Sequence, residues 1–226
     1  MVKLINLYND FNIKDQHKGS IILIGNFDGL HLGHQKLFTL AKKYKKEYSL
    51  KVGVLTFEPM PKMYFNPNIK NFRISNQLQK INLLSKFNVD FMITKKFNKK
   101  FSKTNSLDFI KKVLVKKLNA KFIFVSNNFR FGNKREGDVK QLIKYENNYD
   151  YSIINPKPLF NKKKIVSSSL IRNYLEKGKL DKANKLLNRN WSVQGSVQKG
   201  KQLGKKIGFP TANIDIKDSV LACPGV

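Results

Sequence analysis

Residues 21–34 constrain the fold more than any other stretch of the chain. Residues 21–24 are consecutive apolar residues, which is typical of a strand buried on both faces, and a helical pattern of apolar residues begins at Gln35. Between the two lie the glycines Gly25, Gly29 and Gly33. A buried strand, a glycine-rich turn and an amphipathic helix in this order predict the first unit of a parallel sheet, with space for a phosphate at the carboxyl end of the strand.

The same alternation of strand and helix continues to about residue 187. We predict strands at 21–24, 52–57, 91–93 and 122–125, and helices at 35–48, around 78–84, and at 107–118, 169–176 and 180–187. The expected N-caps are Ser75, Asn105 or Ser106, and Ser167 or Ser168. Together these elements predict an α/β domain with a Rossmann-like, doubly wound parallel sheet.

The chain is strongly basic, with 44 Lys+Arg against 15 Asp+Glu and a formal net charge of +29. A surplus of this kind permits nucleic-acid binding through the release of counterions. It equally fits a general drift toward lysine, because lysines occur in nearly every segment, and anionic nucleotide substrates would benefit from the resulting field. We favour drift and keep nucleic-acid binding as an alternative.

The sequence also restricts the compartment. The longest apolar runs, such as 21–24 and 122–125, are far too short to span a bilayer, and residues 1–20 lack the apolar stretch of a signal peptide. Cys223 is the only cysteine, which rules out an intrachain disulfide and a thiolate metal cluster. We therefore expect a cytoplasmic protein without a membrane partner, and the sequence predicts no oligomeric state.

His31 and His34 are the candidate catalytic pair. Their spacing places both imidazoles on one side of the first helical turn, where unpaired backbone N–H groups and the helix dipole favour an anion. Such donors would stabilise the charge that develops during phosphoryl transfer. One alternative is a metal site that also includes Asp28, although residues at i, i+3 and i+6 fan around a helix. Another is that the histidines only cap the helix or fill its surface.

The segment from Gly25 to Gln35 closely resembles the adenylyltransferase signature of the bacterial bifunctional riboflavin kinase/FAD synthetase family. Three further blocks resemble that family in order and spacing, at 56–61, 128–138 and 167–172. The resemblance covers almost the whole chain. It implies an FAD synthetase that transfers AMP from ATP to FMN and releases pyrophosphate, with Mg²⁺ accompanying ATP.

The resemblance also implies roles for individual residues. The implied catalytic residues are His31, His34 and Arg172. The implied ATP-binding residues are Gly25, Asn26, Phe27, Asp28, Gly29, Ser168 and Ser169. The flavin is implied to lie against Asn128, Phe129 and Phe131, because aromatic faces stack on planar rings. Ordinary core packing is the alternative for the two phenylalanines.

Three positions depart from the family pattern. Met60 stands where His is usual, Ser126 where Gly is frequent, and Ser169 where Thr is usual. Ser169 keeps the hydroxyl group. Met60 removes a titratable side chain, so any phosphate or proton-transfer role of that position in relatives does not carry over.

Residues 195–213 resemble the opening of the family's riboflavin kinase barrel. In relatives a Thr and an Asn hold Mg²⁺ and ATP there, which implies a relic metal site at Thr211 and Asn213. We expect an FMN adenylyltransferase domain at 1–187, an N-terminal fragment of a riboflavin kinase domain at 188–226, and no riboflavin kinase activity from these residues. Alternatives are an adenylyltransferase with another acceptor, and a nucleic-acid-binding protein derived from a degenerate nucleotidyltransferase.

Overall fold

The computed structural model describes residues 4–200 and 203–223 and is built on a six-stranded sheet. Every neighbouring pair in the order β1-β4-β3-β2-β5-β8 is parallel. The strands are β1 (Asn6–Tyr8), β2 (Ile21–Ile24), β3 (Val52–Glu58), β4 (Phe91–Lys96), β5 (Phe122–Phe124) and β8 (Ser152–Ile154). The chain runs from β2 to β3 on one side of β2 and later returns to β5 on the other side. The order of the strands therefore reverses beside β2, and ligands bind at this point in sheets of this type.

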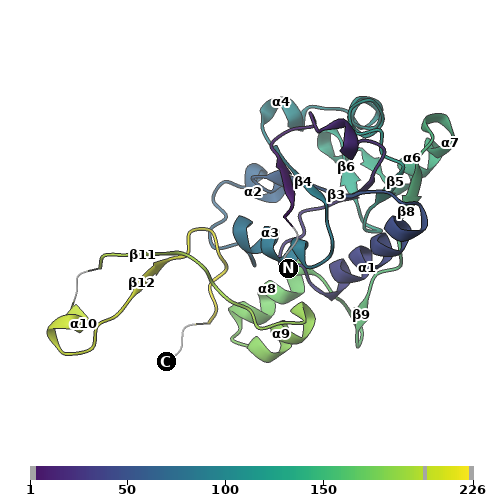
Figure 1. The fold of residues 1–226 in the computed structure, drawn as a ribbon. Helices are drawn as coiled ribbons and strands as arrows, with labels where there is room; N and C mark the ends of the chain where they lie inside the picture. The colour runs from purple at the N-terminus through teal and green to yellow at the C-terminus, as the bar shows by residue number, and fades with distance from the viewer. Residues whose placement is uncertain (1–3, 201–202, 224–226) are drawn as a thin grey trace.

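Helices surround the sheet and fill the crossovers between parallel strands (Figure 1). The longer ones are α1 (Leu32–Glu47), α3 (Gln77–Ser85), the π-helix η2 (Phe109–Lys117), α8 (Ser168–Glu176) and α9 (Leu180–Leu187). The short ones are η1 (Asp15–His17), α2 (Pro61–Phe65), α4 (Lys99–Ser102), α5 (Ser106–Asp108), η3 (Asn133–Arg135), α6 (Val139–Lys144), α7 (Glu146–Tyr149) and α10 (Leu203–Lys206).

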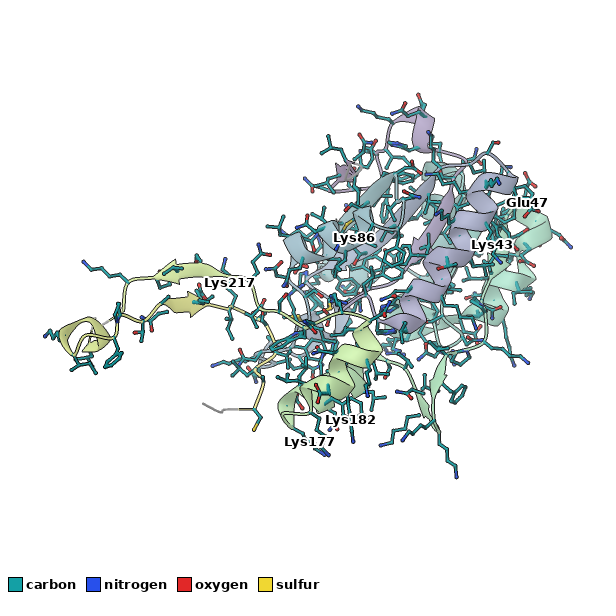
Figure 2. All side chains as sticks on the ribbon, turned by 60° about the horizontal axis from the view of Figure 1, so that its bottom comes forward. Lys43, Glu47, Lys86, Lys177, Lys182 and Lys217 are labelled. Atoms are coloured by element: carbon teal, nitrogen blue, oxygen red, sulfur yellow. The ribbon has the colours of Figure 1, made fainter. Side chains whose placement is uncertain are left out.

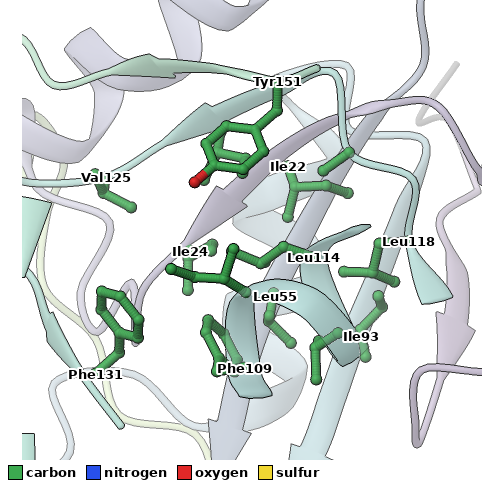
Figure 3. Close-up of a cluster of buried hydrophobic side chains, with 14 of the residues drawn as sticks. Ile22, Ile24, Leu55, Ile93, Phe109, Leu114, Leu118, Val125, Phe131 and Tyr151 are labelled. Atoms are coloured by element: carbon green, nitrogen blue, oxygen red, sulfur yellow. The ribbon is translucent and has the colours of Figure 1, made fainter. Parts of the chain in front are cut away.

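The two faces of the sheet bury two separate apolar clusters. Alternate residues of β2 divide between them: Ile22 and Ile24 face η2 and α6, whereas Ile21 and Leu23 face α1 and α3. Figure 3 shows the first cluster, in which Leu114 of η2 lies over the strand residues. All four residues of β2 are at most 3% exposed, so the strand that leads into the glycine-rich turn is tightly packed on both faces.

A third cluster joins the helices α8 and α9 to two distant pieces of chain, represented by Ile74 and Val220. Beyond α9, the antiparallel strands β11 (Ser196–Gln198) and β12 (Asn213–Asp215) form a ribbon that projects away from the domain (Figure 1). Two smaller antiparallel pairs complete the fold: β6 (Arg130–Phe131) with β7 (Gly137–Asp138), and β9 (Phe160–Asn161) with β10 (Lys164–Ile165).

The structure confirms the predicted fold class and all four predicted strands, and it adds β1 and β8 at the two edges of the sheet. The predicted cap at Ser75 was wrong by one residue. Asn76 caps α3 instead, because its side chain accepts from the Gln79 amide at 2.8 Å while the Gln79 side chain bonds back to the Asn76 amide. Helix α1 starts at Leu32, three residues before the predicted start.

The helices of the described chain differ from membrane-spanning helices. None of those between residues 4 and 200 or between 203 and 223 combines the length and the apolar character that a bilayer span requires.

Candidate active site

His31 forms the beginning of α1. It is the N-cap residue, and its Nδ1 atom accepts a hydrogen bond from the His34 amide at 3.3 Å. A nitrogen that accepts this bond carries no proton, so in the neutral ring the proton lies on Nε2. Burial lowers the pKa of His31 to about 4, and the positive charge of Arg172 acts in the same direction. At neutral pH His31 is therefore an uncharged N–H donor.

His34 lies directly against His31, as the i, i+3 spacing predicts. The two rings are stacked with centroids 3.7 Å apart and planes 18° apart. Burial, together with the charges of His31 and Lys80, lowers the pKa of His34 well below its ordinary value. Its Nδ1 atom is buried and has no hydrogen-bond partner among the described residues. Both imidazoles are thus neutral at neutral pH, so any positive charge at this place comes from other groups.

Phe27 packs against His34. Its ring is 3% exposed and contacts His34 edge to face, with centroids 5.2 Å apart, and it also contacts Phe38 of α1. The backbone turns here with a φ of 47° at Phe27 and 79° at Gly29. A Cβ atom at Gly29 would lie 2.8 Å from the Ile74 side chain, so this position requires glycine both for its backbone conformation and for its packing.

Asp28 is held by residues from two distant parts of the chain. Its carboxylate accepts from the Ile74 amide at 3.0 Å, from the Ser75 amide at 3.1 Å and from the Arg172 guanidinium at 2.7 Å. It is 2% exposed. With this many donors already bound, Asp28 has little capacity left for a ligand, and its role in the structure is to join the turn after β2 to residues 72–75 and to α8.

Arg172 is buried beside Asp28. Its Nε donates to the Phe72 carbonyl at 2.7 Å, and its guanidinium lies 3.6 Å from the centroid of the Phe72 ring. Ser168 at the start of α8 donates through Oγ to the backbone carbonyl of Asp28 at 2.8 Å. The sequence prediction that Ser168 and Arg172 act beside the glycine-rich turn is consistent with this placement, although both side chains contact protein groups. Ser169, by contrast, is exposed.

The residues predicted for the flavin follow β5, the strand that borders β2 on the side opposite to β3. Asn128 is exposed, and its Oδ1 accepts from the Ser126 hydroxyl at 2.9 Å. Phe129 and Phe131 stack on each other with centroids 5.5 Å apart and planes 17° apart. Phe131 is also packed against Phe109, so core packing accounts for one of the two rings, while the half-buried Phe129 covers it.

The described residues do not supply a metal-binding cluster of His, Cys, Asp and Glu side chains. The alternative in which Asp28, His31 and His34 bind a metal has no support, because Asp28 is occupied by protein donors and His31 Nδ1 caps the helix. The predicted relic site consists of two exposed residues, Thr211 and Asn213, at the start of β12. Met60, the departure from the family's His, is 1% exposed and is the N-cap residue of α2.

Sequence reasoning missed two features of this region. One is the segment 72–75, whose amide and carbonyl groups hold Asp28 and Arg172. The other is Lys80 on α3, which is 1% exposed. A lysine one turn before the buried Leu84 interrupts the apolar face of that helix, and this interruption was the available signal.

Comparison with known proteins adds independent findings. The FAD synthetase family matches residues 13–170, and the riboflavin kinase family matches residues 187–226. The chain is 38% identical over 215 residues to the bifunctional riboflavin kinase/FMN adenylyltransferase of Buchnera aphidicola from Acyrthosiphon pisum, covering 95% of this chain and 69% of that protein. The protein of the same name from Escherichia coli K12 is 34% identical over 209 residues, covering 92% of this chain and 67% of the relative.

A solved structure is also similar. The crystal structure titled as a macrolide-efflux protein from Streptococcus pneumoniae has a TM-score of 0.83 and 27% sequence identity, and the match covers 97% of this chain and 71% of that one. The fold described above is therefore shared along nearly the whole chain.

Proposed function

The chain belongs to the FAD synthetase family, and we propose that its adenylyltransferase site is the turn between β2 and α1 together with the start of α8. The enzyme is an FMN adenylyltransferase, as its relatives are named. The single observation that carries the assignment of the site is the stacked pair His31 and His34 at a helix N-terminus beside the buried Arg172.

In the reaction, a phosphate oxygen of FMN attacks the α-phosphorus of ATP. A new P–O bond forms, the bond between the α-phosphorus and the bridging oxygen breaks, and its electron pair leaves with pyrophosphate. The attacking phosphate is already ionised at neutral pH, so the chain does not have to supply a general base. Its residues instead position the phosphates and stabilise their charge.

His31 donates from Nε2 to a phosphoryl oxygen in this proposal. The donor stays neutral through the reaction because its pKa is about 4, and the Nδ1 bond to the His34 amide fixes the direction of the ring. The His34 amide is used by His31 Nδ1, so the N-terminus of α1 contributes chiefly the positive end of the helix dipole to the same anion. Ser169, Asn26 and the backbone of Gly25 are proposed to line the path of ATP, and Asn128 and Phe129 that of the flavin.

Arg172 and Asp28 do not contact the substrate in this proposal, and they position charge beside it. Asp28 fixes the guanidinium in place, and the guanidinium adds positive charge beside the histidines. Mg²⁺, which we propose accompanies ATP, has no protein carboxylate cluster to receive it among the described residues and would be bound through the nucleotide phosphates. We propose the cytoplasm as the compartment and residues 1–187 and 188–226 as the two domain segments.

The decisive experiment supplies purified protein with FMN, ATP and Mg²⁺ and follows FAD and pyrophosphate. His31→Asn is the most informative variant, because Asn is also a good N-cap and can accept from the His34 amide while lacking the Nε2–H donor. We expect it to fold and to lose at least about a hundredfold in kcat, as expected when a transition-state donor is removed.

His17→Asn is the matched control, since His17 lies before β2, at the opposite end of that strand from the active site. Folded His17→Asn protein should form FAD at a rate within about twofold of the wild type. No FAD from folded wild-type protein would contradict the function. Equal rates for His31→Asn and the wild type would contradict the site. Replacing FMN by other phosphorylated acceptors in the same assay tests the alternative of a different acceptor.

A further inference from the structure

Lys80 has an environment that structural lysines rarely have. It lies on the buried face of α3, is 1% exposed, and its Nζ atom has no hydrogen-bond partner among the described residues. Moving an ammonium group out of water costs several kcal/mol unless a counter-charge and hydrogen bonds replace the water. Accordingly, burial is the main cause that lowers the pKa of Lys80. The exposed Lys86, at the end of the same helix, shows the ordinary situation of a lysine on this surface (Figure 2).

The polar atoms of this region share the same lack of partners. Within the described chain, buried side-chain atoms without a hydrogen bond include His34 Nδ1, Thr56 Oγ1, Ser75 Oγ, Gln77 Oε1 and Lys80 Nζ. Thr56 is near the carboxyl end of β3 and pairs with Thr94 on β4. Gln77 on α3 donates to the Thr94 hydroxyl at 3.1 Å, which places α3 over this part of the sheet. The charge of Lys80 acts on His34. Buried groups are almost always paired in a finished structure, so several unpaired ones in one region indicate a place for a polar ligand.

The charges around Lys80 are also unbalanced. Two carboxylates act on it, but each already has an arginine partner: Asp28 is paired with Arg172, and Glu58 is paired with Arg73. Counting these five groups gives three positive and two negative charges, and Lys80 is the one left over. Further out, the exposed Asp218 contacts Arg73, and Arg189 interacts with Asp28, so these two charges offset one another. A bound anion would neutralise the excess.

We propose that Lys80 is a binding residue for a phosphate group of a substrate, in a polar subsite formed with Thr56, Ser75 and His34. This inference rests on the proposed location of the active site, to which His34 belongs. A phosphate oxygen would give Nζ the missing acceptor and remove the unbalanced charge in one step. Both proposed substrates, ATP and FMN, carry phosphate groups.

Lys80→Met and Lys80→Arg test the subsite. Methionine has a similar length and no charge, whereas arginine keeps the charge. Lys86→Met is the matched control, because it removes one positive charge from an exposed position at the C-terminal end of the same helix. Binding of four ligands is measured by calorimetry at fixed salt: ATP and adenosine as one pair, FMN and riboflavin as the other. Within each pair only the first member carries phosphate.

We expect Lys80→Met to weaken either ATP or FMN about tenfold to a hundredfold, which is the usual loss for a charge-assisted hydrogen bond. Whichever ligand weakens is the source of the phosphate. Adenosine and riboflavin should bind as before, Lys80→Arg should recover much of the affinity, and Lys86→Met should stay within about twofold. The midpoint of thermal unfolding of ligand-free Lys80→Met should be equal to or above that of the wild type, because an unpaired buried charge has been removed.

Two results would overturn the inference. One is unchanged affinity of Lys80→Met for both ATP and FMN. The other is an equal loss for all four ligands with a lower unfolding midpoint, which is the signature of a structural lysine. If Lys80→Met does not fold, the lysine side-chain carbons of the wild type are followed by NMR through a pH titration. The pKa of Lys80 should rise when ATP or FMN is bound, and an unchanged value contradicts the proposal.

Binding and turnover are measured separately, so the two hypotheses fail in different ways. Wild-type protein that binds the phosphate ligands through Lys80 but makes no FAD contradicts the proposed function while the subsite stands. Wild-type protein that makes FAD and is unaffected by Lys80→Met contradicts the subsite alone.

Discussion

The sheet domain and the segment that follows α9 bury their apolar side chains very differently. In the domain, the residues of β2 are at most 3% exposed, whereas on the ribbon Val197 is 70% and Phe209 is 76% exposed. Yet the same segment buries Val220 to 1% against α8 and α9. The segment is therefore packed against the domain at its two ends and exposed in its middle. The match to the riboflavin kinase family begins at residue 187, but side chains after that residue still pack into the domain.

The attached ends contact the part of the domain that holds Asp28. Trp191 donates through Nε1 to the Ile74 carbonyl at 3.1 Å, and Val220 donates its amide to the Arg73 carbonyl at 2.8 Å. The Ile74 amide in turn donates to Asp28. Residues that match the riboflavin kinase family thus support the loop that holds Asp28 beside the proposed adenylyltransferase site.

The largest effect should come from a charge at the attached end. Val220→Asp places a carboxylate in the third cluster and should lower the free energy of unfolding by about 4 kcal/mol, measured by urea denaturation. Val197→Asp, the same change on the exposed ribbon, should cost less than about 0.5 kcal/mol. Similar losses for the two variants would remove the distinction between attached and free parts.

The pH dependence of stability should belong to the domain, because residues 188–226 contain no histidine. The pKa of His31 is about 4 in the folded protein, against an ordinary value of 6.5, so between these pH values the unfolded state binds more protons. Stability should be full above pH 6.5 and fall by up to about 3 kcal/mol as pH drops toward 4, with His34 contributing in the same direction.

His31→Asn isolates this contribution. Its free energy of unfolding, measured by urea denaturation at a series of pH values, should fall less steeply from pH 6.5 to about pH 4 than that of the wild type. Superimposable curves would show that His31 is not the titrating group.

A smaller effect is expected for the contact between the segment and the loop. Trp191→Phe keeps an aromatic ring and removes only the donor to Ile74, so it should lower the free energy of unfolding by about 1 kcal/mol. Thermal unfolding measures this change. Tyr44→Phe is the control, because the Tyr44 ring on α1 packs against Phe122 and Phe124 of β5. An unchanged midpoint for Trp191→Phe would mean that the contact does not support the loop.

The smallest effect should follow removal of the free middle. Ser196 and Asp215 face each other across the ribbon, so an Asn-Gly turn can replace residues 197–214 and close the hairpin there. FAD formation should stay within about twofold of the wild type. A large loss would show that the exposed ribbon takes part in the adenylyltransferase reaction.

Local features of the site were predictable from the sequence, and distant ones were not. The stacking of His31 on His34 and the turn at Gly29 follow from residues within one short segment. The partners of Asp28 are 46 and 144 positions away, and no local pattern determines such contacts. Likewise β1 has three residues, two of them exposed, so it carries no periodic signal.

The pairing of Asp28 with Arg172 also sets an order of events during protein synthesis. A ribosome adds roughly 5–20 residues per second, so the 144 positions between the two residues correspond to about 7 to 29 seconds. Through that interval the residues of β2 and of the first turn of α1 have already been made, while the Asp28 carboxylate has no arginine to bind. The proposed adenylyltransferase site thus cannot become complete before Arg172 has been made.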